Sequence, residues 1–127
     1  MARIEHFALF AVDAAALKDF YVNVMGLKIV QDNGALSPPG FFLADDDGMA
    51  LEIIGRSADE TTPKTRFVCH IAFTVPDVSA AQAKLETHGL VFETETVVDK
   101  PEMKTMFTYD PEGNRLQIVW RAKPLSN

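Results

Sequence analysis

The chain has 127 residues, 47% of them hydrophobic and 24% charged, with a net charge of −6. This length suits one domain with its own core, and the negative charge argues against broad binding to nucleic acid or to anionic membrane surfaces. No apolar stretch is long enough to cross a bilayer, and "MARIEHFALF" lacks the layout of a signal peptide. A lone cysteine, Cys69, cannot form an internal disulfide, so we expect a cytoplasmic protein.

The two halves of the chain repeat one another. "EHFALFAVD" near the start aligns with "CHIAFTVPD" near the middle, which places His6 on His70. "DDDGMALEII" aligns in the same way with the closing "DPEGNRLQIV". Internal repeats of this kind indicate a duplicated structural unit. We predict a single domain over residues 1–127, made of a first unit (1–54), a polar linker (55–65) and a second unit (66–121).

The first unit begins with residues 4–12, which alternate with the period of a strand. Asp13 is the expected N-cap of a helix, and Gly26 is the expected end of that helix. Three further strands are predicted at residues 27–31, 41–45 and 49–54. The three aspartates that precede Gly48 fit a hairpin turn, because no EF-hand spacing follows them.

The second unit follows the same order of elements. A strand at 67–75 leads to a helix that Asp77 caps and Gly89 ends, with His88 expected at the surface of its last turn. Further strands are predicted near 91–98, at 103–109 and at 114–121. Each half therefore reads βαβββ, and the fold class is α+β.

Alternation along the strands separates a core face from a polar face. Leu51 and Ile53 share one face, which leaves Glu52 on the other, and Gln117 is set apart from its apolar neighbours in the same way. His6 and His70 fall on the same faces as Glu52 and Gln117. These faces also carry small and aromatic residues, a composition typical of a pocket lining.

Two histidines, one glutamate and one glutamine at matched strand positions make a metal-site composition. A single strand histidine is more often a hydrogen-bonded structural residue, but the match of His6 with His70 favours ligation. Neutral imidazole and carboxylate suit Zn, Ni, Co, Mn or Fe as divalent ions. Gln117 fits equally well as a ligand or as a pocket amide, and Cys69, which points away from His70, reads as a buried thiol.

Three segments together resemble the vicinal oxygen chelate superfamily, which includes glyoxalase I, bleomycin-resistance proteins and extradiol dioxygenases. They are "IEHFALFAVDAAALKDFYVNVMGLKIV", "CHIAFTVPDVSAAQAKLETHGL" and "DPEGNRLQIV". The resemblance implies a glyoxalase-like domain whose βαβββ units form cup-shaped mixed sheets around one divalent metal ion per site. The ligand positions it implies are His6, Glu52, His70 and Gln117. It also implies a homodimer in which each site is shared between the two subunits.

The resemblance further implies lyase or isomerase chemistry, with proton transfer on a small oxygenated substrate. Glu52 is the expected catalytic base, because glyoxalase I members place a second glutamate where this chain has Gln117, and an amide accepts no proton at neutral pH. The predicted substrate pocket comprises Ala8, Phe10, Phe42, Ala72, Met106 and Tyr109. Two alternatives stay open: an iron(II) ring-cleavage-type dioxygenase using His6, His70 and Glu52, and a non-catalytic protein that binds an antibiotic or metabolite.

Overall fold

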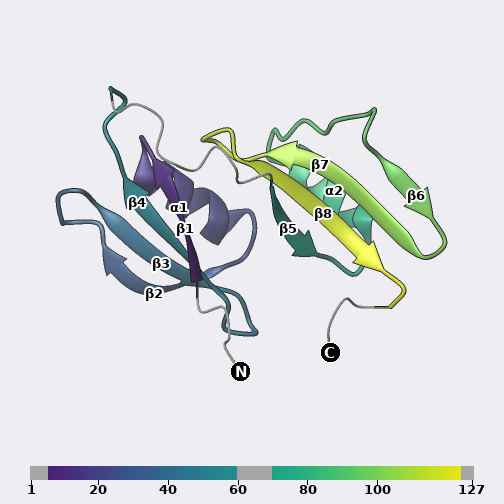
Figure 1. The fold of residues 1–127 in the computed structure, drawn as a ribbon, viewed down its shortest axis with the longest axis horizontal. Coiled ribbons are helices and arrows are strands. Elements are labelled where there is room, and N and C mark those ends of the chain that lie inside the picture. Colours follow the sequence, from purple (N-terminus) through teal and green to yellow (C-terminus); the bar gives the residue numbers. More distant parts are fainter. Residues whose placement is uncertain (1–5, 60–69, 124–127) are drawn as a thin grey trace. The chain divides into compact units, whose positions relative to one another are not determined.

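The computed structural model describes residues 6–59 and 70–123. The chain divides into two compact units, Met1–Phe67 and Val68–Asn127 (Figure 1). Each unit contains one four-stranded mixed sheet and one helix. The predicted α+β fold of two βαβββ repeats is therefore confirmed.

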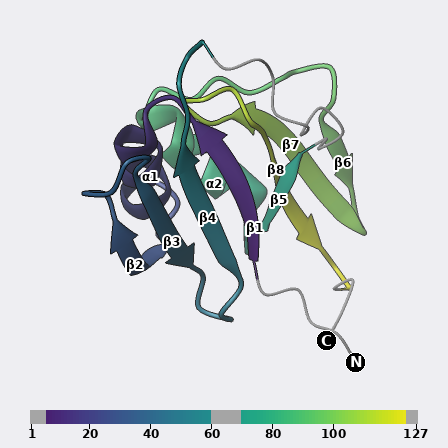
Figure 2. The same ribbon diagram turned by 60° about the vertical axis from the view of Figure 1, so that its left-hand side comes forward.

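The first unit runs through β1 (His6–Ala11), α1 (Ala14–Asn23), β2 (Lys28–Asn33), β3 (Gly40–Ala44) and β4 (Ala50–Gly55). Its strands lie side by side in the order β1-β4-β3-β2 (Figure 2). The first strand pairs with β4 in parallel, while the other pairs are antiparallel. The first and last strands of the unit are therefore neighbours, although the helix and two strands separate them in sequence.

The second unit runs through β5 (Ile71–Thr74), α2 (Val78–Thr87), β6 (Val98–Lys100), β7 (Met103–Tyr109) and β8 (Arg115–Arg121). Its strand order, β5-β8-β7-β6, is that of the first unit, again with a parallel pair between the first and last strands. The same sequence pattern has thus produced the same topology twice.

Both helices begin directly after their predicted N-caps; α2 ends at Thr87, close to the predicted end at Gly89, and α1 ends earlier than predicted, at Asn23. The Asp13 carboxylate accepts a hydrogen bond from the Ala16 amide at 2.9 Å, and the Asp77 carboxylate accepts one from the Ala80 amide at 3.1 Å. Beyond the last turns, Gly26 and Gly89 adopt φ values of 80° and 86°, which residues with a Cβ rarely adopt. The caps therefore fix the length of each helix locally.

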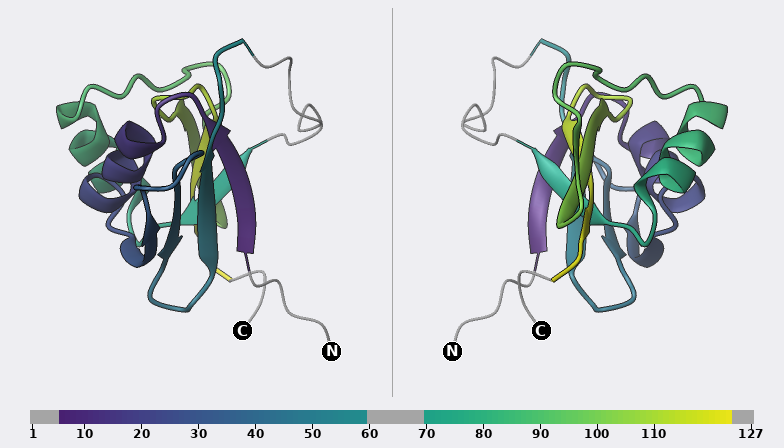
Figure 3. Two further views of the ribbon diagram at one scale, coloured as in Figure 1. Left: turned by 90° about the vertical axis from the view of Figure 1, so that its left-hand side faces the viewer. Right: turned by 90° about the vertical axis from the view of Figure 1, so that its right-hand side faces the viewer.

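Each helix packs against one face of its own sheet (Figure 3). In the first unit the apolar residues that lie between α1 and the sheet are buried, among them Leu17, Tyr21, Leu51 and Ile53. In the second unit Leu116 and Ile118 are buried in the same way. The opposite face of each sheet carries the residues that alternate with these, Glu52 in the first unit and Gln117 in the second among them, as the periodicity predicts.

One predicted strand is largely wrong. Residues 91–97 are not in regular strand conformation, and β6 begins only at Val98. The segment still contacts β7, because the Glu93 amide donates to the Phe107 carbonyl at 2.9 Å and the Thr108 hydroxyl donates to the Val91 carbonyl at 2.8 Å. One backbone bond and one side-chain bond stand here in place of a regular ladder, and a pattern of alternating apolar residues does not predict that.

Some sequence-based predictions lie outside the described residues. Cys69 is one of them, as are most of the linker at 55–65 and the start of the strand predicted at 67–75. Among the residues that the structure does describe, no helix is long and apolar enough to cross a membrane.

Candidate functional site

In the first unit, β1 and β4 bring a histidine and a carboxylate together on the face opposite α1. Glu52 lies between Ala8 of β1 and Phe42 of β3 in the register of the sheet. The His6 Nε2 atom lies 3.5 Å from Glu52 Oε1, and the two side chains are 34% and 25% exposed. The Phe42 ring meets the His6 imidazole edge to face, with centroids 5.3 Å apart.

In the second unit, the equivalent residues repeat this arrangement. Gln117 of β8 lies between Ala72 of β5 and Phe107 of β7. His70 directly precedes β5, and its ring meets Phe107 edge to face with centroids again 5.3 Å apart. Each unit thus carries a half-site of one histidine, one phenylalanine and one side chain with an oxygen.

The two half-sites differ in charge. Glu52 contacts its histidine as an ion pair when the imidazole is protonated, whereas Gln117 is a neutral amide. The sequence predicts this asymmetry from the two hairpins alone. The four predicted ligands therefore contain one carboxylate, not two.

The geometry of the first half-site fits two ligands of one divalent ion. Two metal bonds of about 2.1 Å at a tetrahedral angle place their ligand atoms about 3.4 Å apart. The 3.5 Å between His6 Nε2 and Glu52 Oε1 agrees with this, and it is longer than a charge-assisted hydrogen bond. Each unit by itself provides two of the four predicted ligands. Within residues 6–59 and 70–123, no group of three or more His, Cys, Asp or Glu side chains is gathered closely enough to hold a metal ion.

Five of the six predicted pocket residues lie on the faces that carry the half-sites. Ala8, Phe10 and Phe42 share the face of Glu52, and Ala72 and Tyr109 share the face of Gln117. Phe10 and Tyr109 are 39% and 45% exposed, so both offer apolar surface to a ligand.

The predicted position of Met106 is corrected by the register of β7. Met106 pairs with Ile118, a buried residue on the α2 side of the sheet, whereas its neighbour Phe107 pairs with Gln117. Met106 instead lines an open cavity of about 570 Å³ next to the end of α2, together with Glu86 and Val91. Successive strand residues point to opposite faces, so Met106 and Tyr109 cannot line the same pocket.

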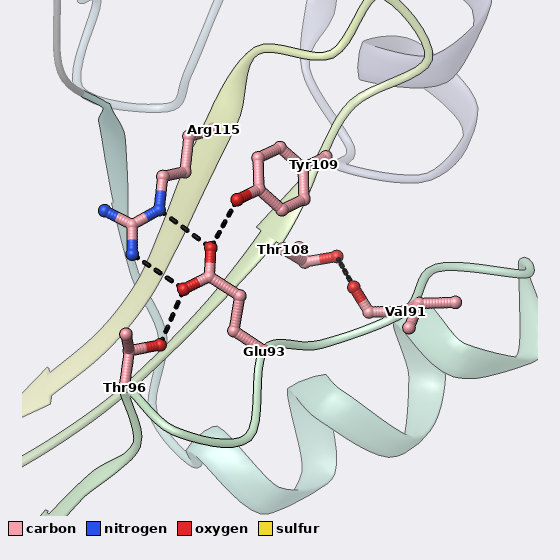
Figure 4. Close-up of polar contacts among 6 residues, drawn as sticks. All are labelled: Val91, Glu93, Thr96, Thr108, Tyr109 and Arg115. Carbon is pink, nitrogen blue, oxygen red and sulfur yellow. Dashed lines mark hydrogen bonds and ion pairs between the residues drawn. The ribbon is translucent and has the colours of Figure 1, made fainter.

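The structure also reveals a polar cluster that the sequence analysis missed. The Glu93 carboxylate accepts hydrogen bonds from Arg115 Nε and Nη2 at 2.8 and 2.7 Å (Figure 4). It also accepts the Tyr109 hydroxyl at 2.5 Å and the Thr96 hydroxyl at 2.8 Å. Because Arg115, then Tyr109 and Thr96, favour the charged form, the pKa of Glu93 falls from 4.5 to about 2.

Arg115 connects this cluster to the second half-site. Its guanidinium carbon lies 3.7 Å from the centroid of the Phe107 ring, the same ring that His70 contacts. Donating hydrogen bonds to the Glu93 carboxylate raises the pKa of Arg115 and also that of the Tyr109 phenol. One signal was available in the sequence: Arg115 and Gln117 are two positions apart in a strand and must share a face.

Comparison with known protein families identifies the superfamily of this chain. Residues 3–118 match the Glyoxalase/Bleomycin resistance protein/Dioxygenase superfamily. This match covers most of the chain and agrees with the duplicated βαβββ topology. The protein belongs to this superfamily.

Individual relatives span several activities within the superfamily. The chain is 28% identical over 123 residues to the Escherichia coli protein YaeR, covering 93% of this chain and 95% of YaeR. It is 26% identical over 122 residues to biphenyl-2,3-diol 1,2-dioxygenase 3 of Rhodococcus globerulus, covering 91% of this chain but 62% of that enzyme. The fold also matches TnmS3, an antibiotic-binding protein from Streptomyces sp. CB03234, with a TM-score of 0.73, 20% identity, and coverage of 96% and 98%.

Proposed function

We propose that this protein is a divalent-metal-dependent enzyme that catalyses proton transfer on a small oxygenated substrate, with lyase or isomerase chemistry. The proposed ligands are His6, Glu52, His70 and Gln117. The observation that carries this proposal is the repeated half-site, in which the same histidine–phenylalanine geometry recurs at 5.3 Å in both units. The composition is compatible with Zn, Ni, Co, Mn or Fe.

A bound divalent ion supplies Lewis-acid polarisation of the substrate oxygens. Glu52 acts as the general base: it removes a proton from the carbon next to the polarised carbonyl and returns it to a neighbouring atom. It is the only side chain among the four ligands with a carboxylate. Gln117 donates its amide hydrogens to a substrate oxygen or contributes its carbonyl oxygen as a weak ligand.

The substrate pocket is proposed from the remaining residues of the half-site faces. Ala8 and Ala72 leave space beside the ligands, and Phe10, Phe42 and Tyr109 offer aromatic surface. A substrate with two neighbouring oxygens and an apolar part suits this composition.

We further propose a cytoplasmic homodimer with shared sites, in which His6 and Glu52 of one subunit act with the partner subunit's His70 and Gln117. Mixing two inactive variants tests this arrangement. His6→Ala and His70→Ala each remove a ligand from every site of their own homodimer. When subunits of the two variants exchange at random, about half of the dimers are heterodimers. One of the two sites in each heterodimer has all its ligands, so about a quarter of all sites regain function. Metal content and activity that stay at the level of the separate variants would exclude sharing.

A second candidate function is iron(II) ring-cleavage-type dioxygenation. Two histidines and one carboxylate are the ligand set of many non-haem iron oxygenases, and the similarity to the biphenyl-diol dioxygenase favours it. Full activity with zinc and without oxygen consumption would exclude this candidate. A third candidate, antibiotic or metabolite binding without turnover, is suggested by the shared fold with TnmS3. Tight binding by chelator-treated protein would favour it.

A further inference from the structure

Arg115 is held in one orientation from two sides. Its Nε and Nη2 atoms form a two-point pair with the Glu93 carboxylate, which Tyr109 and Thr96 hold in turn. Its planar group then lies over the Phe107 ring at 3.7 Å. A two-point pair fixes the plane of a guanidinium, and a planar group held in this way loses less freedom when it stacks on a ring.

Phe107 passes this constraint on to His70. Its ring meets the imidazole edge to face at an interplanar angle of 75°. With Arg115 stacked against it, the Phe107 ring has less freedom to rotate away from His70. A chain of side-chain contacts therefore connects Glu93 to His70 through Arg115 and Phe107.

Within residues 6–59, the first unit has no arginine stacked on its phenylalanine, and a carboxylate contacts its histidine instead. The repeat alignment puts Ala50 at the position of Arg115, and a methyl group cannot stack on Phe42. There the Glu52 carboxylate contacts His6 at 3.5 Å. Gln117 has no charge with which to hold His70 in the same way. The arginine occurs in the unit whose hairpin carries an amide, Gln117, where the other unit carries a carboxylate.

We infer that Arg115 is a positioning residue for His70, locked by Glu93 and acting through Phe107. The inference rests on the proposed function for one point, that His70 is a metal ligand. Partners outside the ligand shell that fix a ligand's orientation typically change metal affinity by about 10- to 100-fold. Because the proposed effect of Arg115 on His70 passes through the Phe107 ring, we expect a change at the low end of this range, about tenfold.

The first test needs no metal. The chain has three histidines, so the imidazole signals of His6 and His70 can be assigned and followed by NMR at fixed pH in metal-free protein. In Arg115→Met we expect the His70 signals to shift and broaden while those of His6 stay unchanged. Lys104→Met, which removes an exposed cation from the same strand as Phe107, is the matched control and should leave both histidines unchanged.

Further variants separate stacking from charge and from folding. Arg115→Lys keeps the charge without the planar group and should behave like Arg115→Met. Glu93→Gln weakens the ion pair with Arg115 but leaves Arg115 and Phe107 in place. It should therefore shift and broaden the His70 signals less than Arg115→Met does. It also serves as the test variant if Arg115→Met fails to fold. Unchanged His70 signals in the folded Arg115 and Glu93 variants would overturn the inference, as would full rescue by lysine.

The second test is a Zn²⁺ titration followed by calorimetry. Arg115→Met should bind Zn²⁺ about tenfold more weakly than the wild type, and Lys104→Met should bind it equally well. A wild-type protein that binds no Zn²⁺ would contradict the proposed function, and the NMR test would still decide the positioning role of Arg115. Equal Zn²⁺ affinity in wild type and Arg115→Met would contradict the positioning role alone.

Discussion

At the scale of single residues, the main feature is the replacement of one hairpin carboxylate by an amide. Glu52 and Gln117 occupy equivalent register positions, each between an alanine and a phenylalanine. In the proposed metal site, two neutral histidines and one carboxylate would balance one of the two charges of a divalent ion. The remaining charge would then attract an anionic oxygen of a substrate.

Glu52→Gln should lower divalent-metal affinity by at least tenfold, because it removes the only carboxylate ligand. It should also lower turnover of the metal-saturated protein by about 10²–10⁴-fold, the usual effect of losing a general base. Calorimetric titration and an activity assay at saturating metal measure the two effects separately. Full turnover in the metal-loaded variant would contradict the role of Glu52 as base.

The matched variant changes the other hairpin. Gln117→Glu adds the second carboxylate and should raise metal affinity, since it brings the ligand set closer to charge balance. The double variant Gln117→Glu/Glu95→Gln, which also removes an exposed carboxylate of the second unit, restores the wild-type net charge and should keep the raised affinity. Weaker metal binding by Gln117→Glu would argue that Gln117 is not a ligand position.

The Glu93 cluster should make the stability of the protein depend on pH. The pKa of Glu93 lies at about 2 in the folded protein, below its ordinary value of 4.5. Its contribution to stability is therefore complete above pH 4.5 and is lost as the pH falls towards 2. In Glu93→Gln, the free energy of unfolding measured by denaturant titration should depend less on pH between 5 and 2. Glu95→Gln should keep the wild-type dependence of the unfolding free energy on pH. The same dependence in Glu93→Gln would contradict a lowered pKa of Glu93.

At the scale of elements, β4 and β8, which carry Glu52 and Gln117, each follow an aspartate-anchored turn. In the second unit Asp110 is 5% exposed, and its carboxylate accepts hydrogen bonds from the amides of Glu112 and Asn114 and from the Asn114 side chain. In the first unit the exposed Asp45 accepts from the amides of Asp47 and Met49. The same turn is therefore more deeply buried and more fully bonded before β8 than before β4.

Asp110→Ala should lower the free energy of unfolding by about 2 kcal/mol, because it leaves buried donors without their acceptor. Asp45→Ala, the matched variant, should cost about 1 kcal/mol or less, because water can replace the carboxylate at an exposed turn. Denaturant unfolding measures both. A larger loss in Asp45→Ala than in Asp110→Ala would contradict the burial argument.

The elements themselves were largely predictable from the sequence. Alternation and caps are local signals, so the caps at Asp13 and Asp77 and the strands around Glu52 and Gln117 were found close to their observed bounds. Residues 91–97 were missed because their conformation depends on distant partners. Glu93 is bonded to Arg115, 22 positions along the chain, and no local pattern encodes that pairing.

At the scale of the whole molecule, the repeat was the most informative signal. It predicted the βαβββ order of elements in both units and the matched positions of His6 and His70. The placement of Met106 failed because hydrophobicity does not say which face of a strand a residue occupies. The link from Arg115 to Phe107 was missed for a related reason, since it joins adjacent strands whose register becomes known only from the structure.

The measurement that most directly tests the central claim is the amount of metal bound per chain, by elemental mass spectrometry on tag-free protein. We expect close to one divalent ion per chain in the wild type and a large loss in both His6→Ala and His70→Ala. His88→Ala, which changes the C-cap residue of α2, should retain the wild-type amount. No bound metal in the wild type, and none taken up on reconstitution with Zn, Ni, Co, Mn or Fe, would contradict the proposed metal site.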